Sequence, residues 1–227
     1  VGVYADAVMH TPVEVTKHAL QVVKELNVDC TVAIGGGSTI GLGKAIALRT
    51  GLPQIAIPTT YAGSEMTPIL GETSDGIKTT QRTLDVLPET VIYDVDLTLT
   101  LPAAMSGTSG INAIAHAVEA LYARDCNPVI ALMAEEGIAA LARSLPVIAN
   151  EPAHIEARSD ALYGAWLCGT CLGSVGMSLH HKLCHTLGGS FNLPHAETHT
   201  IVLPYALAYN APAVPEAMAS IGRALGC

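Results

Sequence analysis

The chain has 227 residues, half of them hydrophobic and 14% charged, and it carries a formal net charge of −9 at pH 7. This length can bury the cores of two domains, whereas eleven Lys and Arg against twenty Asp and Glu argue against a partner with a phosphate backbone, so we expect no nucleic-acid binding. Gly, Pro or a charged residue interrupts every apolar run of bilayer length, so we expect a soluble protein without membrane contact.

Up to residue 60 the sequence alternates between strand and helix patterns. Apolar runs indicate buried strands, and Thr11, Pro12 and Glu14 supply an N-cap, an N1 proline and a capping-box carboxylate for the first helix. This alternation is typical of a doubly wound parallel sheet, the architecture of nucleotide-binding domains. The predicted elements are a strand at 2–8, a helix ending at 26, a strand at 30–34, a helix at 39–50 and a strand at 54–58.

From Thr67 onward the pattern changes twice. Two short strands between turn signals close the first domain, and beyond residue 100 only Ala- and Leu-rich helices follow. We therefore expect an α/β nucleotide-binding domain at 1–100 and an all-α helical domain at 101–227. The predicted strands are 68–72 and 90–94, and the predicted helices are about 102–124, 128–143, 154–174, 177–188, 196–210 and 215–226.

The six cysteines are scattered along the chain and do not form the compact framework of a disulfide-stabilised secreted domain. We therefore expect reduced thiols and a cytoplasmic protein. Cys168 and Cys171 form a C-x-x-C within the apolar stretch GAWLCGTCLG. Because no second pair lies at zinc-ligand spacing, core packing is favoured over a metal site for these two thiols.

A glycine-rich turn follows the second predicted strand and contains Gly35, Gly36, Gly37 and Ser38. Glycines let a backbone approach a pyrophosphate, and we expect Ser38 to cap a helix whose N–H groups and dipole favour an anion. The turn therefore predicts phosphate binding. A plain tight turn is the alternative, because the stretch is not the G-x-G-x-x-G fingerprint.

Three hydroxyl residues, Thr59, Thr60 and Ser64, follow the third predicted strand. They lie beyond its carboxyl end, where open α/β sheets bind ligands, so contact with ribose or phosphate is one interpretation. Local turn and cap hydrogen bonds are the other.

The helical half contains two pairs of polar residues at i, i+4 spacing. Asn112 and His116 share one helix face, His181 and His185 share another, and His195 follows a turn that can return the chain to the same pocket. This pattern favours a functional site over separate core histidines. The remaining histidines show no such partnership and are expected to be surface or capping residues: His10, His18, His154, His180 and His199.

Five segments, IGGGS, IPTTYAGSE, LTLTLP, GINAIAHAVEAL and HKLCHTLGGSFNLPH, occur in the order of the iron-containing alcohol dehydrogenase superfamily, which the chain resembles over nearly all its length. The resemblance implies the dehydroquinate synthase-like, or iron alcohol dehydrogenase, fold. It further implies NADH or NADPH as the cofactor, with Lys78 near it, and a chain that is incomplete at both ends. A homodimer is the default assembly.

In that family an aspartate and three histidines hold a metal ion, and the matching positions here are Asn112, His116, His181 and His195. An amide lacks the negative charge that a hard divalent cation prefers, so we expect that a divalent metal is not required. Asparagine in NAIAH, together with KTTQRTLDVLPETVIYD, resembles the maleylacetate reductase branch, whose members are generally described as working without the metal.

The resemblance to this branch implies NAD(P)H-dependent reduction of the carbon–carbon double bond of 2-maleylacetate to 3-oxoadipate in aromatic compound catabolism. Hydride addition leaves an enolate, which imidazoles can stabilise and protonate. We expect His185 to position the reactants, His116, His181 and His195 to bind the dianionic keto acid or supply the proton, and Asn112 to donate a hydrogen bond. Two alternatives remain: a metal-dependent alcohol dehydrogenase acting on a carbonyl, and a non-catalytic nucleotide-binding fragment.

Overall fold

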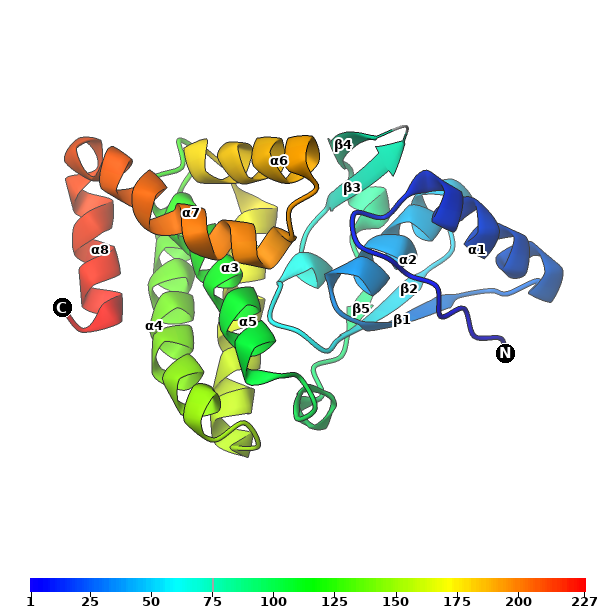
Figure 1. Ribbon diagram of the computed structural model, residues 1–227, viewed down its shortest axis with the longest axis horizontal. Helices are drawn as coiled ribbons and strands as arrows, with labels where there is room; N and C mark the ends of the chain where they lie inside the picture. Colours follow the sequence, from blue (N-terminus) through cyan, green and yellow to red (C-terminus); the bar gives the residue numbers. More distant parts are fainter. Residues whose placement is uncertain (75) are drawn as a thin grey trace. The chain divides into compact units, whose positions relative to one another are not determined.

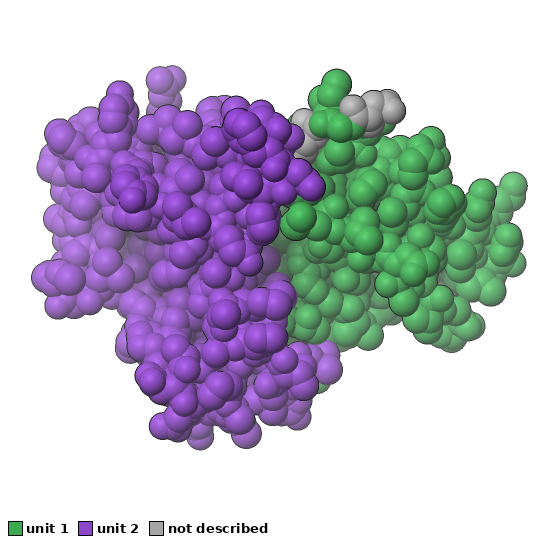
Figure 2. All heavy atoms as spheres, in the orientation of Figure 1, with its two compact units in different colours: residues 1–59, 64–94 green, residues 60–63, 95–227 purple. Residues whose placement is uncertain are grey.

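The computed structural model describes residues 1–74 and 76–227, except for the side chain of Lys78, and the chain divides into two compact units (Figures 1 and 2). Unit 1 comprises residues 1–59 and 64–94, and unit 2 comprises residues 60–63 and 95–227. Unit 1 combines helices and strands, and the described elements of unit 2 are all helical. The predicted class, an α/β domain followed by a helical domain, is therefore confirmed.

Unit 1 contains a three-stranded parallel sheet with strand order β1-β2-β5 and a separate antiparallel hairpin of β3 and β4. Helix α2 connects the parallel strands β1 and β2, as such a pair requires. Ile40 of α2 packs against Ala33 and Ala56 of these strands. The elements are α1 (Val13–Leu26), β1 (Thr31–Gly35), α2 (Gly37–Thr50), β2 (Gln54–Pro58), β3 (Ile69–Ser74), β4 (Ile77–Arg82) and β5 (Thr90–Val91).

The amino-terminal segment forms no strand, contrary to the prediction for residues 2–8. Tyr4 and Ala7 instead pack against a small apolar core that includes Ala19 of α1 and Leu42 of α2. A strand needs a neighbouring strand to pair its backbone N–H and C=O groups, and none of the described strands pairs with this segment.

Both helix starts in unit 1 differ from the predicted caps. Helix α1 begins after Pro12 with no side-chain cap, and Thr11 uses its carbonyl oxygen to accept a 3.3 Å hydrogen bond from the backbone N–H of Thr73. Helix α2 begins after Gly36, so Ser38 lies inside the first turn and does not cap the helix. Strand β4 was not predicted, because IKTTQR is polar after its first residue and gives no hydrophobic period.

In unit 2 helix α3 packs against α4, α5 and α7 (Figure 1). Residues 112–120 of α3 are all buried, as expected for a helix that is covered on every side. Its polar residues are thereby forced into the interior. The helices of this unit are α3 (Ala103–Leu121), α4 (Pro128–Asn150), α5 (Ile155–Ser174), α6 (Leu179–Phe191), α7 (His195–Asn210) and α8 (Pro215–Leu225).

Helix α4 continues seven residues past its predicted end at 143 and contains Pro146. Proline removes one backbone donor, but Leu141 and Ile148 are buried on either side of it, so packing holds the helix together. No single helix among the described residues is both long and apolar enough to cross a membrane; α5 and α6 reach that threshold only as a pair, and this pair is bent by 94°.

Candidate active site

Three helices of unit 2 bring six histidines into one cluster: His116 from α3, His180, His181 and His185 from α6, and His195 and His199 from α7. His199 lies at its centre, because its ring centroid is 4.3 to 6.4 Å from those of the five other imidazoles. The centroids of His185 and His195 are 6.1 Å apart. The structure thus brings together every histidine that the sequence predicted for catalysis.

A chain of hydrogen bonds runs through the buried part of this cluster. Nδ1 of His181 lies 2.7 Å from Oε2 of Glu119, and Nε2 of His181 lies 2.7 Å from Nδ1 of His116. A carboxylate only accepts, so His181 carries its hydrogen on Nδ1 and, when neutral, accepts from His116 through Nε2. Nε2 of His116 then accepts from Nδ2 of Asn112 at 3.5 Å. The predicted donor group of Asn112 is therefore directed at His116.

The carbonyl oxygen of Ala62 lies 3.2 Å from Nε2 of His116. It becomes a hydrogen-bond acceptor when His116 takes up a second proton, because a carbonyl cannot donate. Nε2 of His116 is therefore an atom where this cluster can hold a proton.

Glu119 also fixes the start of helix α6. Its carboxylate accepts hydrogen bonds from the backbone N–H groups of Ser178 at 2.9 Å and His180 at 2.7 Å. The first N–H groups of a helix have no partner within the helix and favour a negative charge. A fully buried carboxylate from α3 thus caps α6 and orients His181 at once.

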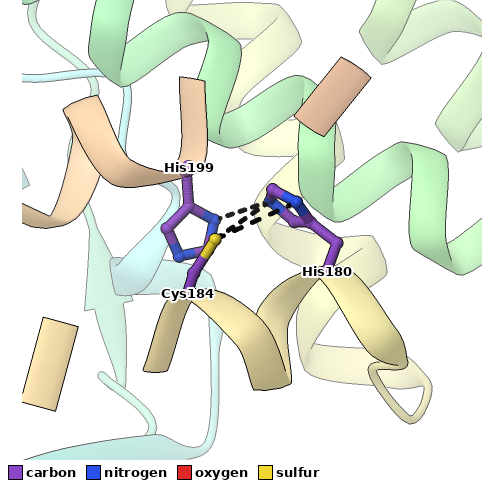
Figure 3. A group of neighbouring side chains, drawn as sticks. All are labelled: His180, Cys184 and His199. Carbon is purple, nitrogen blue, oxygen red and sulfur yellow. Dashed lines mark hydrogen bonds between the residues drawn. The ribbon is translucent and has the colours of Figure 1, made fainter. Parts of the chain in front are cut away.

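His180, Cys184 and His199 form a second buried group, shown in Figure 3. Nε2 of His180 lies 3.0 Å from Nδ1 of His199. The Cys184 sulfur lies 3.9 Å from Nδ1 and 3.8 Å from Nε2 of His180. One ligand atom from each residue lies within 4.8 Å of the others, so the three side chains could also hold a metal ion.

Burial determines the charge of these groups. Loss of solvation lowers the pKa of His116, His180, His181 and His199 below the ordinary histidine value, and neighbouring imidazoles lower it further. Burial, followed by the nearby carboxylate of Glu119, raises the pKa of the Cys184 thiol to about 12. These four imidazoles and the Cys184 thiol are therefore neutral near pH 7.

Asn112, His116, His181 and His195 do not fit a divalent metal centre in this geometry. A tetrahedral ion bound to two imidazole nitrogens would hold them about 3.3 Å apart, whereas the facing nitrogens of His116 and His181 are 2.7 Å apart and share a hydrogen bond. Asn112 adds a neutral amide where a hard cation prefers a carboxylate. Asn112, His116 and His181 are instead arranged to hydrogen-bond to one another.

The loop of residues 60–63 is held against the helical unit by a buried arginine. Arg158 is fully buried. Gly63 also packs closely on helix α5, because a Cβ added to Gly63 would lie 2.9 Å from the Cα of Gly169. The loop that carries the Ala62 carbonyl is thereby fixed. The guanidinium donates to the Tyr61 hydroxyl at 3.1 Å and, each at 2.8 Å, to the Ser106 hydroxyl, the Leu101 carbonyl and the Pro152 carbonyl.

The predicted cofactor residues are divided between the units. Gly35, Gly36, Gly37, Ser38, Thr59 and Ser64 belong to unit 1, and Thr60 belongs to unit 2. The Lys78 side chain lies outside the described residues.

Gly35 has a structural need for glycine. Its φ is 157°, and a Cβ there would lie 2.4 Å from the Thr39 hydroxyl. Since Gly36 offers no side chain as N-cap of α2, the first N–H groups of this helix are accessible to an anion such as a pyrophosphate. A glycine turn at a helix start is a common feature of phosphate sites, so phosphate binding here stays a prediction.

Four site residues were missed or misassigned from the sequence. His180 and His199 are fully buried rather than at the surface, and the sequence pattern assigned no role to Glu119 and Cys184. The i, i+4 spacing of His180 with Cys184 and of His195 with His199 was the available signal. The role of Glu119 gave no signal, because it caps a helix about 60 residues away.

Two protein-family models match the chain. The model described as "Fe-containing alcohol dehydrogenase family, C-terminal" matches residues 106–227, and that described as "Iron-containing alcohol dehydrogenase" matches residues 1–95. The first of these alone covers more than half of the chain.

Individual relatives are similar over essentially the whole chain. A maleylacetate reductase of Sphingobium indicum is 64% identical over 226 residues, 100% of this chain and 64% of the relative. Crystal structures of maleylacetate reductases from Rhizobium sp. and Agrobacterium tumefaciens are 63% and 62% identical, with TM-scores of 0.95. Each alignment covers 99% of this chain and 64% of the solved chain. The chain thus spans about 64% of the length of these relatives.

Proposed function

The chain belongs to the iron-containing alcohol dehydrogenase family, and from this we propose that its parent protein is an NAD(P)H-dependent oxidoreductase that reduces the carbon–carbon double bond of 2-maleylacetate to 3-oxoadipate in aromatic compound catabolism. The names of relatives that are 57% to 64% identical over at least 98% of the chain support this substrate. The observation that carries the proposal is the hydrogen-bonded row from Asn112 through His116 and His181 to Glu119.

The row supports chemistry on a conjugated keto acid. NADH or NADPH supplies a hydride when bound. Addition of a hydride β to the ketone turns the substrate into an enolate, whose α-carbon must then receive a proton. Nε2 of His116 is suited to hold that proton, since the Ala62 carbonyl 3.2 Å away accepts its hydrogen bond in the protonated form. The carboxylate of Glu119, which lies beyond His181 in the row, would stabilise the charge on His116.

His185 and His195 complete the proposed site. Both border the ring of His199, at centroid distances of 6.4 and 4.3 Å. We assign His185 to positioning the reactants and His195 to binding the dianionic substrate. A cluster of imidazole N–H donors suits carboxylate oxygens, because a hydrogen bond to a charged acceptor is stronger than one between neutral groups.

We further propose that this reaction requires no divalent metal. The unsuitable spacing of His116 and His181 and the amide of Asn112 support this view. The second candidate, a metal-dependent alcohol dehydrogenase that reduces a carbonyl, would use the ion to polarise the carbonyl oxygen. The two candidates differ in metal content and in substrate.

The experiment uses the purified full-length protein. Its metal content is measured first, and NADH oxidation is then followed with maleylacetate and with simple aldehydes, each with and without a chelator. We expect rapid, chelator-resistant oxidation with maleylacetate only. Aldehyde reduction that a chelator abolishes would reject the proposal in favour of the metal-dependent enzyme. Binding of NADH without turnover of either substrate would indicate a nucleotide-binding protein.

A further inference from the structure

One ring nitrogen in the histidine cluster lacks a partner. Among the described residues of unit 2, only Oδ1 of Asn112 and Nε2 of His199 are buried side-chain nitrogen or oxygen atoms without a hydrogen bond. Both belong to the same cluster. A buried polar group without a partner is unfavourable, so a protein retains one where a ligand or an ordered water completes the hydrogen bond.

The neighbouring imidazoles offer no such nitrogen. His116 and His181 use both ring nitrogens within the row that ends at Glu119. His180 contacts His199 through Nε2, and the Cys184 sulfur lies 3.9 Å from Nδ1 and 3.8 Å from Nε2 of His180. Nε2 of His199 is therefore the free ring nitrogen among these four buried rings.

The contacts drawn in Figure 3 favour one tautomer of His199. The Cys184 sulfur lies at similar distances from the two ring nitrogens of His180, 3.9 Å from Nδ1 and 3.8 Å from Nε2. Because Nε2 already contacts His199, we take Nδ1 as the acceptor of the weak thiol donor. His180 is then protonated on Nε2 and donates to Nδ1 of His199 at 3.0 Å. A neutral His199 is left with its hydrogen on Nε2, the atom without a partner. In this arrangement Cys184 donates to His180, His180 donates to His199, and the Nε2–H of His199 is left without an acceptor at the centre of the cluster.

We propose that His199 is a substrate-binding residue whose Nε2–H donates a hydrogen bond to an anionic oxygen of the keto acid, with His180 and Cys184 as positioning residues that fix its tautomer. The proposal rests on the proposed function for the identity of the substrate. It adds a residue that lies outside the four metal-ligand positions of the family. The Oδ1 atom of Asn112, in the same cluster, also lacks a hydrogen-bond partner. A ligand bound here, or a water bound with it, would supply that partner.

Kinetic measurement on the full-length enzyme tests the contact. His199→Leu removes the N–H, and we expect kcat/KM for maleylacetate to fall roughly 10- to 100-fold, the range of a hydrogen bond to a charged group, with an unchanged KM for NADH. His199→Gln keeps an N–H donor and should recover much of the loss. His18→Leu, on the exposed face of α1, is the control. Equal kcat/KM in folded His199→Leu and wild type would overturn the proposal.

A spectroscopic measurement tests the tautomer without relying on turnover. Nitrogen-15 NMR of His199 should show hydrogen on Nε2, and this signal should shift when 3-oxoadipate is added. Cys184→Ala should give a mixture of tautomers and a smaller kinetic loss than His199→Leu. Hydrogen on Nδ1, or a signal that 3-oxoadipate does not change, would contradict the assignment. So would a zinc ion bound in stoichiometric amount and lost in Cys184→Ala, because His180, Cys184 and His199 would then be ligands.

The two proposals fail in different ways. A wild-type enzyme that does not reduce maleylacetate refutes the proposed function, whereas the tautomer and the response to 3-oxoadipate still decide the role of His199. An active wild type with an indifferent His199→Leu refutes only the role of His199.

Discussion

Glu119 and His181 are joined by a 2.7 Å contact between a carboxylate oxygen and a ring nitrogen, and both side chains are buried. The same carboxylate accepts the backbone N–H groups at the start of α6. Helix α6 is thereby attached to α3 at the residue that orients the imidazole row. We therefore expect both stability and turnover to depend on this side chain.

Replacement of this carboxylate is the first test. Glu119→Gln keeps the size of the side chain but removes the negative charge at the start of α6. The amide NH₂ group of the new glutamine would also face N–H donors of α6 and His181, which cannot accept a hydrogen bond. We expect the free energy of unfolding to fall by about 1–3 kcal/mol and turnover to fall as well, measured by urea unfolding and NADH oxidation. Glu136→Gln is the matched control, because Glu136 forms an exposed ion pair with Arg143 that contributes at most about 1 kcal/mol. Equal effects of the two substitutions would contradict the role of Glu119.

The buried imidazoles predict how stability depends on pH. The pKa values of His116, His180, His181 and His199 are lowered by burial in the folded protein, while unfolded histidine has a pKa of about 6.5. Below that pH the unfolded chain binds more protons than the folded chain, so the free energy of unfolding decreases as pH falls. Each imidazole contributes up to about 1.4 kcal/mol per pH unit.

Urea unfolding between about pH 8 and pH 5 measures this slope. His180→Gln should reduce the slope by about one proton. Stability that increases on acidification would show that the cluster is protonated in the folded protein.

Arg158 predicts a structural effect that reaches the site. Arg158→Met leaves the Tyr61 hydroxyl, the Ser106 hydroxyl and the Leu101 carbonyl without their donor. We expect a loss of about 2–4 kcal/mol in the free energy of unfolding and reduced turnover, because the loop that carries Ala62 loses its anchor. Arg143→Met, at a half-exposed position, is the control. Unchanged urea unfolding of Arg158→Met would refute this role.

Asn112 offers a test of metal selectivity. Asn112→Asp places a carboxylate beside Nε2 of His116, where a hard divalent cation prefers a charged oxygen, so we expect the variant to bind a divalent metal more tightly than the wild type. Metal content after purification and titration with iron(II) or zinc measure the change. Asn112→Ala removes the amide without adding charge and should not gain affinity. A wild type that binds metal as tightly as Asn112→Asp would contradict the view that the amide excludes the ion.

The sequence by itself determined the kinds of elements and most of their order. Apolar runs and helical periods depend on local spacing, so β1, α2, β2 and the helices of unit 2 were predictable. The i, i+4 spacing also placed Asn112 with His116 and His181 with His185, because one helix turn fixes both members of each pair. The strand at 2–8 was wrong because a strand exists only with a neighbour, and no local pattern reports whether that neighbour is present.

The tertiary structure alone decided which polar groups meet. His180 and His199 lie in isolated-looking positions of the sequence, yet the packing of α6 on α7 places their ring nitrogens 3.0 Å apart. Glu119 reaches residues about 60 positions away because α3 is covered on all sides and its polar side chains can find partners only on other helices. Hydrogen bonds between distant segments are set by the way helices pack in three dimensions, so the proton arrangement of the cluster could be derived only from the folded chain.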